Sequence, residues 1–254
     1  MRLKSRIIMR LLPALLAGML LSACRGEDNS PHCVAGFKEY EILGIDVSAH
    51  NGDIDFEKVS KGGIEFVIIK ATEGGTFKDR MFVDNVRKAR KAGLKIGAYH
   101  FFRFDTPGYI QGLNFANSIH GRNLDLPAVI DIEEYTNPNL QRTKLVMSRV
   151  SEMADYLEKR GYRVMLYTNK RGHARFISGQ LATYPLWLCS LGTPPEGIDC
   201  DIWQATHHGK VSGIDHEVDI NVFTGTRPLW DRFASGIKAE AAHGESNKLP
   251  ETPD

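Results

Sequence analysis

EFVIIKATEGGTFKDRMFVDNVRKARKAGLKIGAYHFF, residues 65–102, contains two short apolar runs separated by an amphipathic segment. Within that segment Phe82, Val86 and Ala89 are spaced i, i+4 and i+7, which predicts one apolar face of a helix. Gly93 stands where that helix should end. The apolar runs have the length of buried strands, so the stretch predicts a strand, a helix and a second, parallel strand.

This alternation occurs five times along the chain and changes after Ser178. The later strand-like segments are joined by short links rich in Gly and Pro, which hold few helices. The pattern predicts an α/β fold, an irregular TIM-like barrel of about five βα units followed by three strands with few helices. The strand-like segments outside the opening stretch are EILGIDVS (41–48), PAVIDIE (127–133), RVMLYT (163–168), YPLWLCS (184–190), DCDIWQAT (199–206) and HEVDINVF (216–223).

A long helix is expected before residue 160. Asn137 followed by Pro138 has the form of a helix N-cap and first helical residue. One apolar face is predicted at Val146, Val150, Met153 and Leu157.

The amino terminus has the pattern of an export signal. Four basic residues and no acidic one precede the apolar run LLPALLAGMLL (11–21). Such a run is too short to remain as a transmembrane helix, so residues 1–23 are predicted to be a signal peptide, with an uncleaved anchor as the alternative. The motif LSAC (21–24) has the form of a bacterial lipobox. It implies cleavage before Cys24, lipidation of Cys24, and attachment to a membrane that the chain does not cross.

The charges of the chain argue against nucleic acid as a partner. The 254 residues include 32 Lys and Arg against 31 Asp and Glu, a formal net charge of +1. Nucleic-acid binding needs several basic groups that neutralise phosphates. Loss of the signal peptide removes four of the 32 basic residues and none of the 31 acidic ones, which leaves a formal charge of −3.

Composition also divides the chain. Residues 24–40 are polar and rich in turn formers, and are predicted to be a flexible tether behind the lipidated Cys24. Residues 41–230 hold all the strand and helix patterns and are predicted to form the barrel. Residues 231–254 lack apolar periodicity and are predicted to be disordered.

Export would place Cys33, Cys189 and Cys200 in a compartment where disulfides form. Three is an odd number, so one thiol must stay free or pair elsewhere. Cys189 and Cys200 lie on neighbouring predicted strands and are the expected pair, with Cys33 free. The alternative is that Cys189 is a small, buried apolar residue.

Polar and aromatic residues collect where the predicted strands end. In a parallel barrel the loops after the strands form the functional face, although any one such residue could equally be a helix cap or a structural polar group. Four acidic residues on apolar strands are harder to explain in that way. The acids are Asp46, Asp131, Glu133 and Asp219, and the other residues are Lys70, Glu73, Tyr99, His100, Tyr167, Trp187, Trp203 and Gln204.

Asp131 and Glu133 are spaced i and i+2, so both side chains leave the strand on one face. Repulsion and partial desolvation should raise one pKa and leave an acid beside a base. Cleavage of a glycosidic bond needs such a pair. The same acids could bind a hard cation, but no histidine cluster has ligand spacing. His173, His207 and His208 are interpreted as surface residues, and we expect no metal.

Tyr99, Tyr167, Trp187 and Trp203 fit a glycan substrate, because aromatic faces pack against sugar rings. Gln204 follows Trp203 at the same strand end and is assigned to the same substrate-binding set. For at least one of the four aromatic residues, a place in the core is the alternative.

Eight segments follow one another along residues 42–224: GIDVSAHNGDIDF, FVIIKATEG, KIGAYHF, PAVIDIE, RVMLYT, YPLW, DIWQ and VDINVF. In this order they resemble the glycoside hydrolase family 25 lysozymes, which are N-acetylmuramidases. The resemblance implies the irregular barrel already predicted. It also implies hydrolysis of the β-1,4 bond between N-acetylmuramic acid and N-acetylglucosamine in peptidoglycan.

The resemblance assigns roles to the four acids. Glu133 corresponds to the general acid/base. Asp131 would orient the acetamido group of the substrate or act as the nucleophile, and the sequence does not choose between the two. Asp46 and Asp219 would position water, substrate or the two central acids.

Two departures from the family pattern lie beside these acids. Ala49 and His50 follow Asp-Val-Ser, where the family commonly has His or another bulky residue at once. Cys189 stands in a Leu-Cys-Ser run where the family usually carries an aromatic residue. Neither departure replaces one of the four acids, so we expect an active enzyme.

The expected partners are peptidoglycan strands and, through the lipid, a membrane, for a monomer that needs no cofactor. Arg25 is not the Asp that retains enteric lipoproteins at the inner membrane, so the outer membrane is favoured, on either its periplasmic or its surface face. Two other functions stay open: a non-catalytic glycan-binding lipoprotein that uses the same groove, and a hydrolase of another N-acetylated glycan such as chitin.

Overall fold

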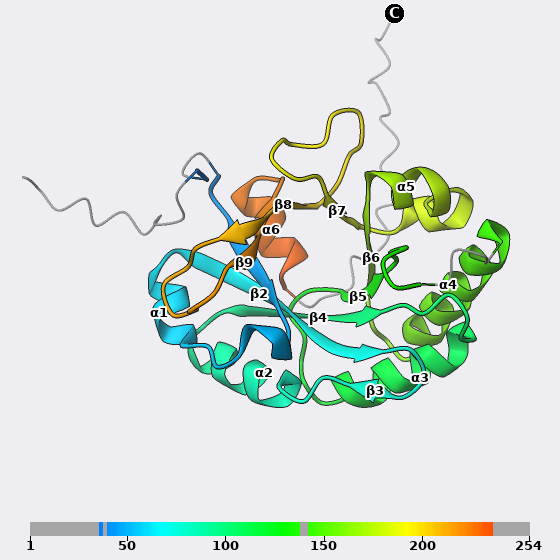
Figure 1. Ribbon diagram of the computed structural model, residues 1–254, viewed down its shortest axis with the longest axis horizontal. Coiled ribbons are helices and arrows are strands. Elements are labelled where there is room, and N and C mark those ends of the chain that lie inside the picture. The colour runs from blue at the N-terminus through cyan, green and yellow to red at the C-terminus, as the bar shows by residue number, and fades with distance from the viewer. Residues whose placement is uncertain (1–35, 38–39, 138–141, 236–254) are drawn as a thin grey trace, which may run out of the picture. The chain divides into compact units, whose positions relative to one another are not determined.

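The computed structural model describes residues 36–37, 40–137 and 142–235 (Figure 1). The predicted signal peptide and Cys24 lie outside these residues, as do most of the predicted tether and tail. No helix in the described ranges is long and apolar enough to cross a membrane. The elements are β1 (Leu43–Val47), η1 (Ala49–Asn51), α1 (Phe56–Lys61), β2 (Ile64–Glu73), β3 (Phe77–Lys78), α2 (Phe82–Lys91), β4 (Lys95–Phe101), α3 (Gly108–Ile119), β5 (Ala128–Asp131), α4 (Thr143–Glu158), β6 (Val164–Asn169), α5 (Lys170–Phe176), η2 (Gly179–Thr183), β7 (Leu186–Cys189), β8 (Ile202–Gly209), β9 (Val218–Phe223) and α6 (Arg227–Phe233).

Hydrogen bonds between neighbouring strands close a barrel. Its order is β1, β2, β4, β5, β6, β7, β8 and β9, after which β9 pairs with β1. Neighbours from β1 to β8 are parallel, whereas β9 is antiparallel to both β8 and β1. The short β3 forms an antiparallel hairpin with β2. The predicted irregular TIM-like barrel is confirmed.

Five helices connect the parallel strands. Helices α1, α3, α4 and α5 follow β1, β4, β5 and β6, and α2 follows the β2–β3 hairpin. Figure 1 shows these helices around the outside of the strands. From Leu186 to Phe223, a range described without gaps, the chain passes through β7, β8 and β9 with no α-helix. The predicted five βα units followed by three strands are therefore correct.

The alternation of side chains along each strand produces two apolar cores. Phe66, Met165 and Trp187 belong to the core inside the barrel. The opposite strand faces pack against the helices. This outer core buries both helix faces predicted from periodicity, which are Phe82, Val86 and Ala89 on α2 and Val146, Val150, Met153 and Leu157 on α4.

The folded body extends beyond both of its predicted limits. Helix α6 continues to Phe233, and Ala234 is 1% exposed. Only one face of this short helix is buried, which is why its sequence reads as a polar tail. At the other end Tyr40, placed in the predicted tether, packs on Trp203 with the ring centroids 5.7 Å apart.

Asn137 does not cap the long helix, because α4 begins at Thr143. Its side chain instead joins two loops at the barrel rim. The amide Nδ2 donates to the backbone oxygens of Phe102 at 2.9 Å and Glu133 at 2.7 Å, and Oδ1 accepts from the backbone N–H of Phe104 at 2.9 Å. Asn137 thus helps to hold the loop that carries Glu133.

Cys189 and Cys200 are both free thiols, so the expected disulfide between them is wrong. The physical reason is the parallel register of β7 and β8, in which Cys189 lies beside Gln204. Cys189 ends β7, whereas Cys200 precedes β8. The two cysteines therefore lie at opposite ends of the barrel.

Close packing of α3 on α4 gives a first prediction. A Cβ atom at Gly108 would lie 1.9 Å from the backbone oxygen of Arg149, a fixed atom of α4. We expect Gly108→Ala to lower the free energy of unfolding by about 1–3 kcal/mol, the usual cost of overpacking, as measured by urea denaturation. Asn117→Ala, at an exposed position of the same helix, is the control and should change it by less than about 0.5 kcal/mol. Equal midpoints for the two variants would contradict the tight contact.

Candidate active site

The acids predicted from the sequence meet at one end of the barrel. Asp46 and Asp131 lie near the carboxyl ends of β1 and β5, and Glu133 follows β5. Because β9 runs antiparallel, Asp219 near its start reaches the same end and pairs with Asp46 across the sheet. The charges of Glu133 and Asp46 act on one another and on their acidic neighbours.

Two side-chain amides hold Asp46 and Asp219 together. Gln204 Nε2 donates to Asp46 Oδ2 at 2.9 Å and to Asp219 Oδ2 at 3.1 Å. Asn221 Nδ2 donates to the same Asp46 oxygen at 2.8 Å. The amide protons offset part of the repulsion between the two carboxyl groups, so the pair can stay close.

Two buried aromatic residues orient these amides. The Tyr167 hydroxyl donates to Gln204 Oε1 at 2.7 Å, and Trp187 Nε1 donates to Asn221 Oδ1 at 2.8 Å. An indole N–H is only a donor, so the Asn221 oxygen must face Trp187 and its NH2 group must face the acids. The inner core of the barrel therefore sets the direction of the amides that contact Asp46.

Asp131 and Glu133 form the second acidic pair. Burial, and then the charge of Glu133, raise the pKa of Asp131 well above its ordinary value. Burial also raises the pKa of Glu133, against the opposing effect of the nearby Tyr167 hydroxyl. Asp131 is 4% exposed, and its Oδ1 has no hydrogen-bond partner in the described part of the chain. The raised pKa values favour a proton on this pair, and Asp131 Oδ1 is a free acceptor.

Burial also acts on the first acidic pair. It raises the pKa of Asp46 to about 8, with the charge of Asp219 as the next cause. It raises the pKa of Asp219 to about 6, although the hydrogen bond with Asp46 lowers it. At neutral pH the pair therefore holds about one negative charge.

Two of the predicted sugar-binding aromatics do not reach the rim. Trp203 faces the helix side of β8, where Nε1 donates to the Ser190 oxygen at 2.8 Å and the ring packs on Tyr40. Since Gln204 faces inward, its neighbour Trp203 must face outward. Trp187 points inward but is 2% exposed, which leaves no free ring face for a sugar. Both residues are removed from the substrate-binding set.

The remaining members of that set lie among the acids. Tyr99 is half-buried on the inner face of β4, with its ring centroid 6.4 Å from that of Trp187. Tyr167 is 6% exposed and contacts the site through its hydroxyl. Gln204 is 2% exposed, and its side chain bonds to Tyr167, Asp46 and Asp219. Of these three, Tyr99 presents the most open side chain.

The sequence interpretation missed Asn221. Asn221 is i+2 from Asp219 and so shares its face, a signal that was present in the segment VDINVF. His207 is exposed, as predicted for a surface residue, and its Nδ1 lies 3.1 Å from Asp219 Oδ1. A bulge in β8 between Gln204 and Thr206 turns His207 back to the inner face.

A second bulge, between Lys70 and Thr72 of β2, brings Lys70 and Glu73 to the same face. Lys70 Nζ lies 2.9 Å from Glu73 Oε2, and Arg103 Nη1 lies 3.7 Å from Glu73 Oε1. The charge of Lys70 lowers the pKa of Asp131 against the effect of burial. Lys70 is thus the cation that acts on the central acids from the β2 side.

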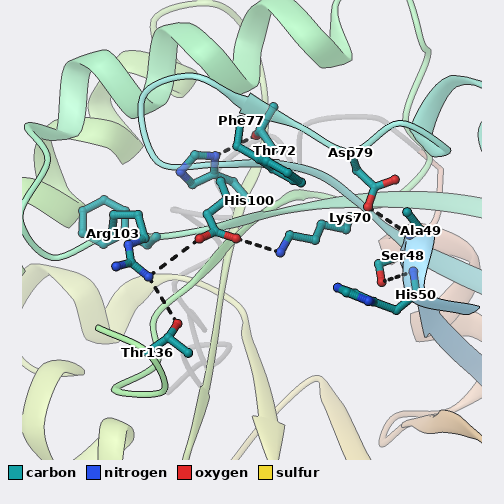
Figure 2. A network of polar contacts seen from close by, with 12 residues as sticks. Ser48, Ala49, His50, Lys70, Thr72, Phe77, Asp79, His100, Arg103 and Thr136 are labelled. Atoms are coloured by element: carbon teal, nitrogen blue, oxygen red, sulfur yellow. Dashed lines mark hydrogen bonds and ion pairs between the residues drawn. The ribbon is translucent and has the colours of Figure 1, made fainter. Parts of the chain in front are cut away.

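His100 lies away from these acids. Figure 2 shows it turned toward Thr72, whose Oγ1 is 2.7 Å from Nδ1. Its Nε2 is 3.0 Å from Gln111 Oε1, and burial lowers its pKa to about 4. His100 is a neutral, structural residue of the outer core.

A cavity of about 530 Å³ opens beside Glu133, Tyr167, Cys189 and His207. A larger cavity of about 1200 Å³ is lined by Val164, Pro185 and Asp201, at the end of the barrel where the parallel strands begin. It contains none of the four acids, so the smaller cavity is the candidate site. Within the described ranges no group of three or more His, Cys, Asp or Glu side chains is arranged to hold a metal ion.

Comparison with known families agrees with this geometry. The sequence model described as "Glycosyl hydrolases family 25" matches residues 45–214. The chain belongs to glycosyl hydrolase family 25. The family resemblance drawn from the eight sequence segments is thereby confirmed, and the matched range holds Asp46, Asp131 and Glu133 but not Asp219.

Named relatives and solved structures of family 25 enzymes are similar to the chain. The autolytic lysozyme of Clostridium acetobutylicum is 34% identical over 185 residues, which are 72% of this chain and 56% of that protein. Lysozyme M1 of Streptomyces globisporus is 34% identical over 203 residues, 73% and 68% of the two chains. The structure of a family 25 glycosyl hydrolase from Bacillus anthracis has a TM-score of 0.73 at 34% identity, and covers 80% of this chain and 98% of that one. The chain therefore spans little more than half of the first of these relatives.

The raised pKa values of this family 25 protein predict a loss of stability at alkaline pH. The pKa of Asp46 is about 8 in the folded protein against 3.8 in the reference state, so between these values the folded state binds more protons than the unfolded chain. The stabilisation is complete below about pH 4 and is lost as the pH rises through 8. Each pKa unit corresponds to about 1.4 kcal/mol, or roughly 3 °C of Tm for a domain of this size.

We expect the Tm to fall between pH 5 and pH 9 in thermal unfolding followed by circular dichroism. Asp46→Asn cannot ionise at this position and should flatten the decrease. Asp55→Asn is the control, because Asp55 is exposed and its pKa is lowered by hydrogen bonds with Lys58. A Tm of the native chain that rises over this range would contradict the assignment.

Proposed function

We propose that the protein hydrolyses the β-1,4 bond between N-acetylmuramic acid and N-acetylglucosamine in peptidoglycan. The observation that carries this proposal is the buried Asp131–Glu133 pair beside a cavity at the carboxyl end of the barrel. A protonated carboxyl next to a second carboxyl is the arrangement that glycosidic cleavage requires. The lysozyme names of relatives at 34% identity support the choice of glycan.

Glu133 is proposed as the general acid/base. It is half-buried, lines the cavity, and has a raised pKa caused first by burial. A raised pKa favours the protonated carboxyl, the form that donates a proton to the leaving oxygen.

Asp131 is proposed to orient the acetamido group of the sugar. Its buried Oδ1 has no hydrogen-bond partner in the described part of the chain, and an acceptor left in this state costs about 1–3 kcal/mol. A substrate N–H would satisfy it and turn the acetamido oxygen toward the anomeric carbon. The alternative role, direct attack by Asp131, predicts a covalent sugar on this residue.

Asp46 and Asp219 are proposed to complete the site. Gln204 and Asn221 donate to Asp46, so that the remaining oxygens of the pair can hold a water molecule or a sugar hydroxyl. Outside this centre, two exposed aromatic side chains follow strand ends at the same rim. Phe77 is 51% exposed after β2, and Tyr135 is 74% exposed after β5. We assign both to sugar stacking, in place of Trp187 and Trp203.

The experiment is digestion of purified peptidoglycan with typing of the new reducing ends by borohydride reduction and mass spectrometry. New muramic acid ends are the expected result. Ends of N-acetylglucosamine alone would contradict the bond assignment, and cleavage of chitin oligomers alone would favour the other N-acetylated glycan. Binding to peptidoglycan without any new ends would favour the non-catalytic glycan-binding lipoprotein.

We also propose that the exported chain is anchored by a lipid on Cys24 in the outer membrane. The support is the LSAC motif behind a basic and apolar amino terminus, with Arg25 next in sequence. Labelling of cells with a tagged fatty acid should mark the native protein and not Cys24→Ser. Label on both forms, or on neither, would overturn the anchor.

A further inference from the structure

The carboxyl end of β7 carries a thiol that the proposed hydrolysis does not use. Cys189 is half-buried and lines the same cavity of about 530 Å³ as Glu133 and His207. Cys189 Sγ lies 4.0 Å from His207 Nε2, and His207 Nδ1 lies 3.1 Å from Asp219 Oδ1. A thiol, an imidazole and a carboxylate therefore lie next to one another in this order.

This order is the one that activates a sulfur nucleophile. Asp219, whose pKa is raised to about 6, is ionised at neutral pH, and its Oδ1 lies 3.1 Å from His207 Nδ1. A carboxylate at this distance favours a proton on Nδ1, and the lone pair of Nε2 then faces Cys189 Sγ. A nucleophile, a base and a group that orients the base are then all present.

The base is needed because the environment does not ionise the thiol. Burial raises the pKa of Cys189 to about 11, and the charges of Glu133, Asp46 and Asp219 raise it further. At neutral pH Cys189 is therefore a thiol, and its reaction depends on proton transfer to His207. The thiolate is the reactive form of cysteine.

Cys200 provides an internal comparison. It is also free and half-buried, and burial raises its pKa to about 12. Its charged neighbours are Asp201 and Asp199, and no histidine is among them. Cys200 lines the other cavity, at the opposite end of the barrel. It has the burial of Cys189 without the base.

We propose that Cys189 is a covalent modification site, at which a small-molecule disulfide forms a mixed disulfide that closes the glycan groove. The Cys189 sulfur bonds to one sulfur of the reagent, and the reagent S–S bond breaks. His207 Nε2 takes the Cys189 proton and passes it to the leaving thiolate, which departs as a thiol. The small disulfide is the oxidant, so no other electron acceptor is needed.

Closure follows from the position of the adduct. A peptide-sized group on Cys189 would fill the cavity in front of Glu133, where a sugar must lie. This consequence rests on the proposed function, whereas formation of the mixed disulfide does not. Formation of the mixed disulfide and loss of hydrolysis are therefore measured separately.

The test uses the full chain purified in detergent and treated with oxidised glutathione at pH 7.5. Peptide mapping by mass spectrometry follows each cysteine, and reducing-end release from peptidoglycan follows hydrolysis. We expect an adduct on Cys189 and a loss of hydrolysis of about 100-fold, the scale of a displaced substrate. Dithiothreitol should restore activity. Treated Cys189→Ser should keep its own starting activity, and Cys200→Ser should respond like the native chain.

His207→Gln tests the base. We expect it to slow adduct formation on Cys189 about tenfold or more, with no change at Cys200. The proposal is overturned if Cys189 reacts no faster than Cys200, if the adduct leaves hydrolysis intact, or if treated Cys189→Ser loses activity to the same extent. An untreated native chain that releases no sugar would overturn the proposed function alone, because mass mapping still measures the modification.

Discussion

Glu133→Gln should lower the rate of peptidoglycan hydrolysis about 100- to 10,000-fold, the usual contribution of general acid/base catalysis. Glutamine keeps the size of the side chain, but it carries no proton that can pass to the leaving oxygen. The measurement is kcat from reducing-end release, together with a pelleting assay for peptidoglycan binding. Binding should remain within a few-fold of the native protein.

Glu134→Gln is the matched control, since it makes the same chemical change one residue along the chain. The Glu134 carboxyl lies 2.7 Å from Arg171 Nε and also contacts Arg175, on α5. We expect this variant to lose some stability and to keep its catalytic rate. Equal losses of rate in the two variants would remove Glu133 from the role of acid.

Asp131→Asn should have the second largest effect, a loss of kcat of about 100- to 1000-fold. The amide replaces the acceptor Oδ1 or Oδ2 by an NH2 group, so one oxygen can no longer receive a substrate N–H. The same change removes a buried ionisable group, and we expect the Tm at pH 8 to rise by a few degrees, as is common at active sites. Lower activity with higher stability separates a site residue from a structural one.

Asp79→Asn is the control for this combination of a lower rate and a higher Tm. Asp79 is also buried, but its oxygens already accept from the backbone N–H groups of Ala49 and Met81, at 2.9 Å and 2.8 Å. Asparagine keeps one acceptor oxygen and loses the other bond, so the Tm should fall and the rate per folded molecule should stay nearly unchanged. An Asp131→Asn protein that is both less stable and fully active would exclude Asp131 from catalysis.

The two roles of Asp131 are separable with Glu133→Gln and an activated glycoside. The leaving group of such a substrate departs without protonation, so cleavage of the glycosidic bond proceeds. The later attack of water, which needs Glu133 as a base, is slow. A sugar attached to the peptide that contains Asp131 would show direct attack. Release of product without that adduct is the outcome we expect from orientation of the acetamido group.

Much of this site can be predicted from the alternation of side chains between the two faces of a single strand. Asp131 and Glu133 share a face because they are two residues apart, and the same rule applied to Asp219 identifies Asn221. Applied to Trp203 and Gln204, it excludes one of them from the groove, since neighbours on a strand face opposite sides. The low exposure of Trp187 does not follow from alternation. The sequence of β7 does not show how many side chains of other strands cover a ring that points inward.

The bulges set the limit of that rule. His207 and Glu73 face the site only because β8 and β2 each contain an irregular register. One extra residue reverses the faces of all residues that follow it, and neither sequence carries a Gly or Pro at the bulge to mark it. The error in pairing Cys189 with Cys200 has a related origin, because strand adjacency was predicted without the level of each residue along the barrel axis.

Periodicity along the chain determined that this protein is a barrel and which residues fill it, because burial of apolar area rewards the same spacing wherever a strand or helix lies. It also located the Asp131–Glu133 pair, whose members are two positions apart. The contacts of Asp46 with Gln204 and Asn221 join residues 158 and 175 positions apart in the sequence. Closure of β1 on an antiparallel β9 creates those contacts, and with them the raised pKa of Asp46 and the approach of His207 to Asp219 beside Cys189. Desolvation and hydrogen-bond direction depend on every neighbour in space, which is why they appear only once the barrel has closed.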